Sequence, residues 1–311
     1  MKRLCFASLT TLSAVLSLSV VASAADLLDE QFGVKKLVSG CRFTEGPVVD
    51  SRGNLFFSDG PNDRIVRVTV AGEVSDFRKP CGRANGLTLD SQGRLVMCQS
   101  GGNGGGRRVT RLERDGAETV LAAEFDGKPF NAPNDLCIDR QGRIYFTDPN
   151  FGDPKDASQP VAGVYRIDAP SKVVRVLDGL QKPNGILFAA DFRTLYVSDR
   201  GTQKLHRYRL AEDGSLTADG ILYDFAPDRG VDGMRLDSQG NVWAAAGQGP
   251  TTGLFVVSPE GKLLLHKPMP EFSTNLAFGG PELRDLYFTA STSVYHLKTK
   301  VPGAKPLWAG Q

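Results

Sequence analysis

Six residues with oxygen-bearing side chains recur along this chain of 311 residues, each at the start of a short apolar segment. Neighbouring members are 40 to 50 residues apart. They are Glu45, Asn85, Asn134, Asn184, Asp232 and Asn275. Any one of them alone is most simply read as a turn residue, because Asn and Asp are favoured before strands. Brought together, their carboxylate and amide oxygens would instead make a site for a hard cation such as Ca²⁺ or Mg²⁺.

The segments that follow these six residues share one pattern. The stretch from Asn134 reads NDLCIDRQGRIYFTD, in which a turn containing Gly142 separates two short runs of β-forming residues. A third run follows each such hairpin, and a fourth follows most of them. Repeats of roughly this length with about four short strands each are typical of propeller blades. The sequence therefore predicts an all-β protein, a six-bladed β-propeller with four antiparallel strands in each blade.

A propeller would bring the six residues together. The first strand of each blade lines the central channel, and its first residues stand at one mouth of that channel. We refer to the six as the ring residues. A cation with six to eight ligands cannot contact all of them and leave space for a substrate. We expect the two carboxylates to bind first, which leaves Asn85 and Asn275 to meet substrate or water.

The last repeat needs a fourth strand from elsewhere in the chain. It supplies three strands, the last ending near Leu297. Either Val34 to Val38 or Lys305 to Trp308 would complete the blade. We expect the N-terminal segment, because pairing the two chain ends closes the ring and removes an exposed sheet edge.

The N-terminus has the pattern of a secretory signal. Lys2 and Arg3 precede an apolar run, Leu4 to Val21, which ends in the small residues Ala22-Ser23-Ala24. A membrane anchor is the alternative, but Ser and Thr dilute the run and a cleavage site follows it. We expect residues 1–24 to be a signal peptide cut after Ala24, so that the mature protein is periplasmic or extracellular.

Residues 25–311 are expected to form one catalytic propeller domain, because the repeats fill this length without a linker. The net charge is +2, with acidic and basic residues mixed throughout. This pattern argues against nucleic acid or a membrane surface as a partner. We expect a small-molecule substrate and a monomer or weak homo-oligomer.

Four cysteines follow the signal segment. Cys41 and Cys81 each stand four residues before a ring residue, so they occupy equivalent places in neighbouring blades. A disulfide between them is one interpretation, and two thiols beyond bonding distance is the other. Cys98 and Cys137 lie in apolar strands and are expected to be buried thiols. Their spacing lacks the CxxC pattern of zinc or redox sites.

The histidines do not suggest a catalytic centre. His206, His266 and His296 all fall in outer strands, away from the ring residues. The sequence also lacks a G-x-S-x-G nucleophile elbow. Any chemistry at the ring must therefore depend on a metal and carboxylates.

Four separated motifs resemble the regucalcin/gluconolactonase family, also called the senescence-marker-protein family. They are EGP at Glu45, NAPND at residues 131–135, PNG at residues 183–185 and VDGM at residues 231–234. The resemblance covers essentially all of the chain after the signal segment. It implies a six-bladed propeller with a divalent metal in the axial channel, hydrolysing sugar lactones or related esters.

The resemblance also implies roles for single residues. Glu45, Asn184 and Asp232 match the family's metal ligands, and Asp232 matches its catalytic base or nucleophile. Asn134 matches a residue that contacts substrate and, in some members, metal. With Asn85 and Asn131 it is expected to orient the substrate. Family members that prefer aldonolactones carry an arginine where this chain has Ala132, which leaves the identity of the lactone open.

Three functions stay in view at this point. The first is an exported gluconolactonase-like hydrolase in which Ca²⁺, or alternatively Mg²⁺, Mn²⁺ or Zn²⁺, polarises the carbonyl. The second is a phosphotriesterase of the diisopropyl-fluorophosphatase type, which uses a similar calcium-bearing propeller. The third is a non-catalytic propeller that binds a protein or glycan and holds a structural metal.

Overall fold

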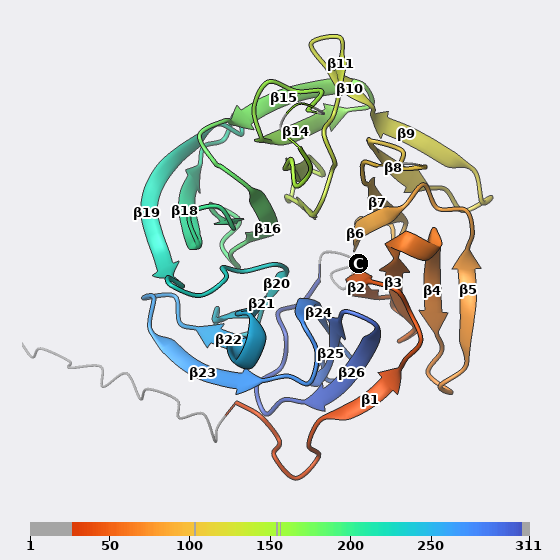
Figure 1. Ribbon diagram of the computed structural model, residues 1–311, viewed down its shortest axis with the longest axis vertical. Helices are drawn as coiled ribbons and strands as arrows, with labels where there is room; N and C mark the ends of the chain where they lie inside the picture. Colours follow the sequence, from red (N-terminus) through yellow and green to blue (C-terminus); the bar gives the residue numbers. More distant parts are fainter. Residues whose placement is uncertain (1–26, 103, 154, 156, 307–311) are drawn as a thin grey trace, which may run out of the picture.

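Six four-stranded antiparallel sheets stand in a ring around a central channel in the computed structural model of the protein (Figure 1). The structure describes residues 27–102, 104–153, 155 and 157–306. The sheet order confirms the predicted six-bladed β-propeller with four strands in each blade. The expected signal peptide, residues 1–24, lies outside the described residues.

The first three blades follow the chain in order. Blade one contains β2 (Thr44–Val49), β3 (Leu55–Asp59), β4 (Arg64–Val68) and β5 (Val74–Arg78). Blade two contains β6 (Ala84–Leu89), β7 (Leu95–Gln99), β8 (Arg108–Leu112) and β9 (Glu118–Ala122). Blade three contains β12 (Leu136–Ile138), β13 (Ile144–Asp148), β14 (Gly163–Ala169) and β15 (Lys172–Leu177). Between blades two and three, β10 (Glu124–Phe125) and β11 (Lys128–Pro129) form a small hairpin.

The other three blades complete the ring. Blade four contains β16 (Pro183–Phe188), β17 (Thr194–Asp199), β18 (Lys204–Leu210) and β19 (Leu216–Asp224). Blade five contains β20 (Met234–Leu236), β21 (Val242–Ala246), β22 (Gly253–Val257) and β23 (Leu263–Pro268). Blade six contains β24 (Ser273–Gly279), β25 (Asp285–Ala290), β26 (Ser293–Lys298) and β1 (Lys35–Val38). The 3₁₀ turns η2 (Gly60–Asn62) and η4 (Gly249–Thr251) lie between strands. Among the described residues, no helix is long and apolar enough to cross a membrane.

The N-terminal strand closes the ring. β1 pairs antiparallel with β26, in a register that places Lys35 opposite His296. This confirms the expectation that a strand near Val34 to Val38 completes the last blade. The backbone N–H of Ala304 bonds to the carbonyl of Leu236 in blade five, and the alternative segment, Lys305 to Trp308, lies partly outside the described residues.

The core lies between neighbouring blades. Inner strands bury nearly every side chain, whereas fourth strands such as β5 are largely exposed. The largest buried side chains include Trp243, Tyr145 and Tyr165, which fill the wedges between sheets. This gradient explains why the first two runs of each repeat are apolar and the last is polar.

The turn between the first two strands explains the recurring Asp-x-x-Gly motif. The Asp50 carboxylate accepts the backbone N–H groups of Arg52 (2.9 Å) and Asn54 (2.8 Å), and Gly53 adopts a φ of 82°. A side-chain acceptor of this kind stabilises a tight turn, and glycine tolerates the positive φ. The same carboxylate contacts recur at Asp90, Asp139 and Asp237. These turns lie at the far end of the first strands from the ring residues.

Candidate active site

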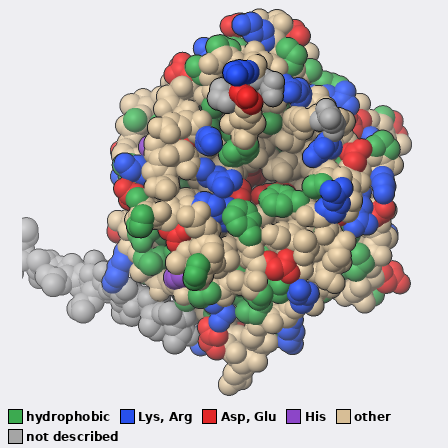
Figure 2. Space-filling view, in the orientation of Figure 1, with side chains coloured by type: hydrophobic (Ala, Val, Ile, Leu, Met, Phe, Trp, Pro, Cys, Tyr) green, Lys and Arg blue, Asp and Glu red, His purple; other side chains and the backbone are tan. Residues whose placement is uncertain are grey.

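The ring residues stand where the first strands begin. Four lie within those strands, and Asn134 and Asp232 lie two residues before β12 and β20. All six are buried except Asn85, which is partly exposed. Figure 2 shows a hollow near the middle of this face, with acidic side chains inside it and basic side chains beside it. The propeller therefore gathers the predicted set around one axis.

Glycines let the first strands approach one another at this end. The N–H of Gly86 bonds to the carbonyl of Asn134 in the next blade at 2.8 Å. A Cβ on Gly86 would lie 2.5 Å from that oxygen, and one on Gly233 would collide with the side chain of Asn275. Gly46 and Gly185 are crowded in the same way by Asn85 and Asp232. A larger residue at these positions would push the strands apart, so these glycines keep the ring narrow.

Glu45 is held by two donors. Its Oε2 accepts the backbone N–H of Gly46 at 2.8 Å and the Nδ2 of Asn275 at 3.0 Å. Burial raises the pKa of Glu45 well above its usual range, and the nearby carboxylates of Asp232 and Asp135 raise it further. These carboxylates repel one another, so a cation between them would relieve an unfavourable arrangement.

Asn275 does not have the free role expected from the sequence. Its Nδ2 donates to Glu45, and its Oδ1 accepts the backbone N–H of Leu276 at 2.9 Å. Both ends of the amide are therefore engaged by protein groups. The side chain therefore orients a carboxylate of the ring, a contact that the sequence analysis, which left Asn275 to meet substrate or water, did not predict.

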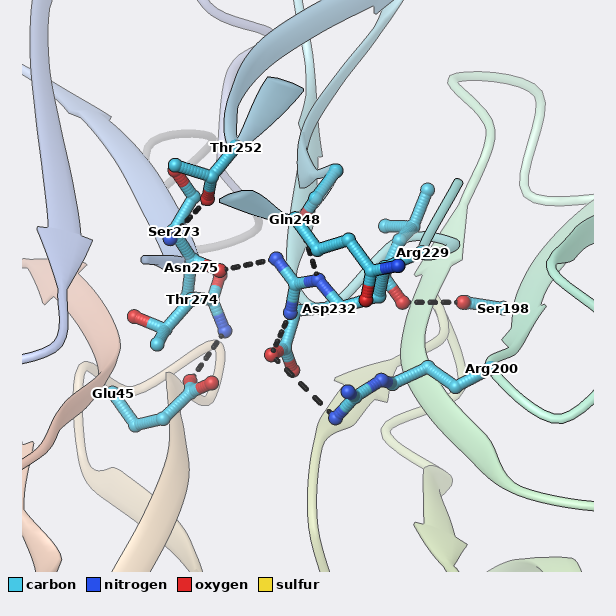
Figure 3. A network of polar contacts seen from close by, with 12 residues as sticks. Glu45, Ser198, Arg200, Arg229, Asp232, Gln248, Thr252, Ser273, Thr274 and Asn275 are labelled. Carbon is cyan, nitrogen blue, oxygen red and sulfur yellow. Dashed lines mark hydrogen bonds and ion pairs between the residues drawn. The ribbon is translucent and has the colours of Figure 1, made fainter. Parts of the chain in front are cut away.

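Asp232 is held by an arginine that sequence reasoning missed. Arg229 Nη1 donates to Asp232 Oδ2 at 2.8 Å, while the other guanidinium nitrogens bond to the carbonyls of Gly247 (2.7 Å) and Ser273 (2.6 Å) (Figure 3). The Phe272 ring covers this guanidinium, 4.0 Å from the ring centroid. In the sequence, the one feature that links Arg229 to the site is its position three residues before Asp232.

The donor set fits a hard divalent cation. The Oδ1 of Asn134 is buried and has no hydrogen-bond partner among the described residues. Such an orphaned acceptor is costly unless a ligand satisfies it. Among all the described residues, no group of three or more His, Cys, Asp and Glu side chains is arranged to hold a metal. The ring combines carboxylates with amide oxygens instead, which is a ligand type that calcium accepts.

A third carboxylate, Asp135, also lines this region. In blade three it takes the place that glycine has after four of the other ring residues. Burial raises the pKa of Asp135 to about 6, although Arg235 lowers it and a backbone N–H from Leu136 does the same. Arg235 comes from β20 and donates to the carbonyl of Pro47 at 3.3 Å. The sequence feature that points to Asp135 is the NAPND motif, in which Asp stands where four of the other ring residues are followed by glycine.

Aspartates at the ends of second strands hold the segments that precede the ring residues. The Asp148 carboxylate accepts the N–H groups of Asn131 (2.9 Å) and Ala132 (2.7 Å). Burial raises the pKa of Asp148 to about 7. Two further aspartates act in the same way, Asp59 on Arg42 and Phe43, and Asp199 on Gln181 and Lys182. These carboxylates therefore fix the approach of each first strand.

The two other residues expected to contact substrate differ in how they are held. Asn131 is buried, its Oδ1 accepts the N–H of Gln159 at 2.9 Å, and its Nδ2 has no partner among the described residues. Asn85 is more exposed, and its Nδ2 donates to the carbonyl of Asn134 at 3.3 Å. Asn131 thus has an unused donor, and Asn85 is the ring residue most open to solvent.

The bridge considered between Cys41 and Cys81 is not formed. All four described cysteines are free and buried. The Cys41 thiol lies 3.9 Å from Arg64 Nη2, and the Cys81 thiol lies 3.5 Å from Asp63 Oδ1. The two sulfurs belong to separate core clusters, because equivalent positions in neighbouring blades face different partners. Burial raises the pKa of Cys41 to about 11 and that of Cys81 to about 12.

The remaining sequence predictions about thiols and histidines are confirmed. Cys98 and Cys137 are buried free thiols in the inter-blade core. The histidines lie in third or fourth strands, His206 in β18, His266 in β23 and His296 in β26. None of the three is a ring residue.

Comparisons with known proteins identify the family of this chain. Residues 43–292 match the family described as SMP-30/Gluconolactonase/LRE-like region. A gluconolactonase of Zymomonas mobilis is 30% identical, with 89% of this chain aligned to 84% of that protein. The structure of a Xanthomonas campestris gluconolactonase has a TM-score of 0.77 and 30% identity, covering 86% of this chain and 89% of that one.

A more distant structure shares the architecture. Regucalcin of Agrobacterium tumefaciens, described as a calcium-binding protein, superposes with a TM-score of 0.73 at 20% identity and covers 88% of this chain and 96% of that one. At that identity the likeness concerns the fold. The family match and the two gluconolactonases extend over most of the chain, and the chain therefore belongs to the SMP-30/gluconolactonase/LRE-like family.

Proposed function

We propose that this protein is a lactonase, a hydrolase that opens the ring ester of sugar lactones or related compounds. Its family membership supports an enzyme of this class, since relatives over most of its length are named gluconolactonases. The observation that carries the proposal is the buried ring of carboxylate and amide oxygens at one end of the axial channel. Two carboxylates and an orphaned amide oxygen are poised there for a cation and an ester.

The residues that would hold the cation are Glu45, Asn134, Asn184 and Asp232. Their mixed charged and neutral oxygens favour Ca²⁺, which accepts flexible shells of six to eight ligands. When bound, the cation would act as a Lewis acid on the ester carbonyl and stabilise the negative charge that develops on its oxygen. Mg²⁺, Mn²⁺ and Zn²⁺ are the alternatives to compare.

Asp232 would serve as general base or nucleophile. Arg229 engages only its Oδ2, and Oδ1 accepts no hydrogen bond from the described residues. The fixed oxygen orients the carboxylate, and the other oxygen is the atom that can take a proton from water or attack the carbonyl. Asn85, Asn131 and Asn134 would then orient the substrate, with the unpaired Nδ2 of Asn131 as one donor.

The test is a substrate panel on purified protein. Sugar lactones and phosphotriesters are each assayed after chelation and after restoring Ca²⁺, Mg²⁺, Mn²⁺ or Zn²⁺ singly. We expect lactone hydrolysis that chelation abolishes and Ca²⁺ restores best. Hydrolysis of phosphotriesters without lactones would replace the proposal with a phosphotriesterase. Inactivity on every ester under all metal conditions would favour a binding propeller.

We also infer that the mature protein is exported. The basic residues Lys2 and Arg3, the apolar run and the small residues ending at Ala24 support this inference. N-terminal sequencing of the protein from cell fractions tests it. A mature N-terminus at Ala25 in an exported fraction is expected, and retention of Met1 in the cytoplasm would contradict export.

A further inference from the structure

A second arginine, Arg200, reaches the ring from blade four. It follows the last residue of β17, and its backbone N–H bonds to the carbonyl of Lys182 at 3.0 Å. Figure 3 shows its side chain extending toward Asp232, and its Nη1 lies 4.0 Å from Asp232 Oδ2. The side chain is 28% exposed. A cationic group accessible to solvent therefore stands beside the proposed base.

The two arginines near Asp232 differ in how their donors are used. Arg229 is buried and spends its guanidinium on one carboxylate and two carbonyls. The Arg200 guanidinium makes no hydrogen bond within the described part of the chain, and 4.0 Å is beyond hydrogen-bond distance. A guanidinium carries five N–H donors. Those of Arg200 are thus available to a molecule that enters the mouth.

Arg200 is not required to neutralise Asp232. Arg229 already contacts the same oxygen at 2.8 Å with much less exposure to water. The closer and drier pair dominates the electrostatic energy, because the effective dielectric is lower there. Arg200 therefore adds positive charge at the mouth beyond what this carboxylate needs.

An aromatic side chain supports the position of Arg200. Its guanidinium carbon lies 5.4 Å from the centroid of the Phe151 ring, which is in the segment after β13. Phe151 is 42% exposed, unusual for a large apolar residue. Stacking on an aromatic ring restrains a guanidinium while leaving its N–H edge free. Arg200 and Phe151 together make one wall beside the ring.

We propose that Arg200 is a substrate-binding residue that selects lactones bearing an additional anionic group, such as a carboxylate, sulfonate or phosphate. This inference rests on the proposed lactonase function and narrows its substrate class. Planar guanidinium groups pair with such oxyanions through two parallel hydrogen bonds. The alternative is that Arg200 only balances the buried carboxylates around it, in which case the charge of the substrate would not matter.

The test uses two lactones with the same ring. Glucono-γ-lactone carries a terminal hydroxymethyl group, and glucaro-γ-lactone carries a carboxylate there. We expect the wild-type protein to prefer the anionic lactone. Arg200→Gln should lower its kcat/KM about tenfold or more, chiefly through KM, and change the neutral lactone less than about twofold. Arg200→Lys keeps the charge and should retain part of the preference.

A matched control is Arg52→Gln, because Arg52 is exposed on a turn at the opposite end of the first strands. It should leave both lactones unaffected. Equal losses on both lactones in Arg200→Gln, or no loss on the anionic one, would overturn the inference while the lactonase function stood.

Calorimetric titration with glucarate separates the two proposals, since it needs no turnover. Glucarate should bind wild-type protein more tightly than Arg200→Gln does, by about the same factor as the loss in kcat/KM. If neither lactone is hydrolysed, the proposed function fails, and this titration still tests Arg200. Equal glucarate affinity in both proteins would contradict the role assigned to Arg200.

Discussion

The side-chain amide of Asn275 in blade six donates a hydrogen bond to the carboxylate of Glu45 in blade one, with Nδ2 and Oε2 3.0 Å apart. This contact joins the last blade to the first at the mouth of the channel. Nearby, Thr274 Oγ1 donates to the carbonyl of Thr44 at 2.8 Å across the same junction. Closure of the ring therefore also orients one carboxylate of the site.

This relationship predicts how two substitutions differ in metal affinity. Glu45→Gln removes a charge from the ring and should weaken Ca²⁺ binding about 100-fold or more. Asn275→Ala removes only the group that orients Glu45, and losing such a supporting hydrogen bond costs about 10- to 100-fold, so its loss should be the smaller of the two. Calorimetric titration of both variants with Ca²⁺ measures the difference. Equal losses would show that Glu45 is not a ligand.

Arg229 is expected to be a determinant of stability as well as of the site. Arg229→Met leaves the buried Asp232 carboxylate and two carbonyls without their donor. Breaking a buried ion pair by removing one partner costs about 3 to 5 kcal/mol. Urea unfolding should show a loss of that order. Arg200→Met is the matched control and should change the free energy of unfolding by less than about 1 kcal/mol.

Asp148 should make stability depend on pH in a defined direction. Burial raises its pKa to about 7, from an ordinary value of about 4, so the folded protein favours the protonated carboxyl. Its contribution to stability is therefore complete below about pH 4 and is lost as the pH rises to about 7. The unfolding free energy of wild type, minus that of Asp148→Asn, should fall by on the order of 4 kcal/mol across this range.

Urea unfolding at several pH values measures that difference. Asp115→Asn serves as the control, because Asp115 lies on an exposed turn. Comparison with this variant separates the effect of the buried carboxylate from that of any Asp-to-Asn change. A wild-type advantage over Asp148→Asn that grows as the pH rises would contradict the assignment.

The free cysteines predict that stability does not depend on reductant. Cys41 and Cys81 are buried thiols in separate clusters. In denaturant without reductant, alkylation followed by mass spectrometry should label both. Protection of this pair from alkylation, released by reductant, would show a disulfide after all.

The fold could be predicted closely because its signals are local and repeated. The turn at Asp50 and the glycines beside the ring residues each encode one contact, and the recurrence of both in four of the six repeats makes the periodicity visible. The pairing of β1 with the last blade could be predicted because the last repeat supplies only three strands, and because an unpaired sheet edge is unfavourable. The ring residues followed from their common place in each copy.

The supporting residues could not be predicted in the same way. Arg229 bonds to carbonyls of blades five and six, and nothing local in its sequence marks those partners. The contact of Asn275 with Glu45 joins residues 230 positions apart in the chain, and no local pattern indicates it. The sequence analysis therefore left Asn275 to meet substrate or water. Contacts of this kind depend on how the blades close, which periodicity does not specify.

The central claim is that Asp232 performs the chemistry at a metal-binding ring. Its most direct test is kcat for lactone hydrolysis by Asp232→Asn, which keeps the size and an acceptor for Arg229 but removes the base. We expect kcat to fall by about 10² to 10⁴. The control Asp115→Asn should leave kcat unchanged, and the thermal midpoint of Asp232→Asn shows that this variant is folded. Wild-type kcat in a folded Asp232→Asn protein would contradict the account.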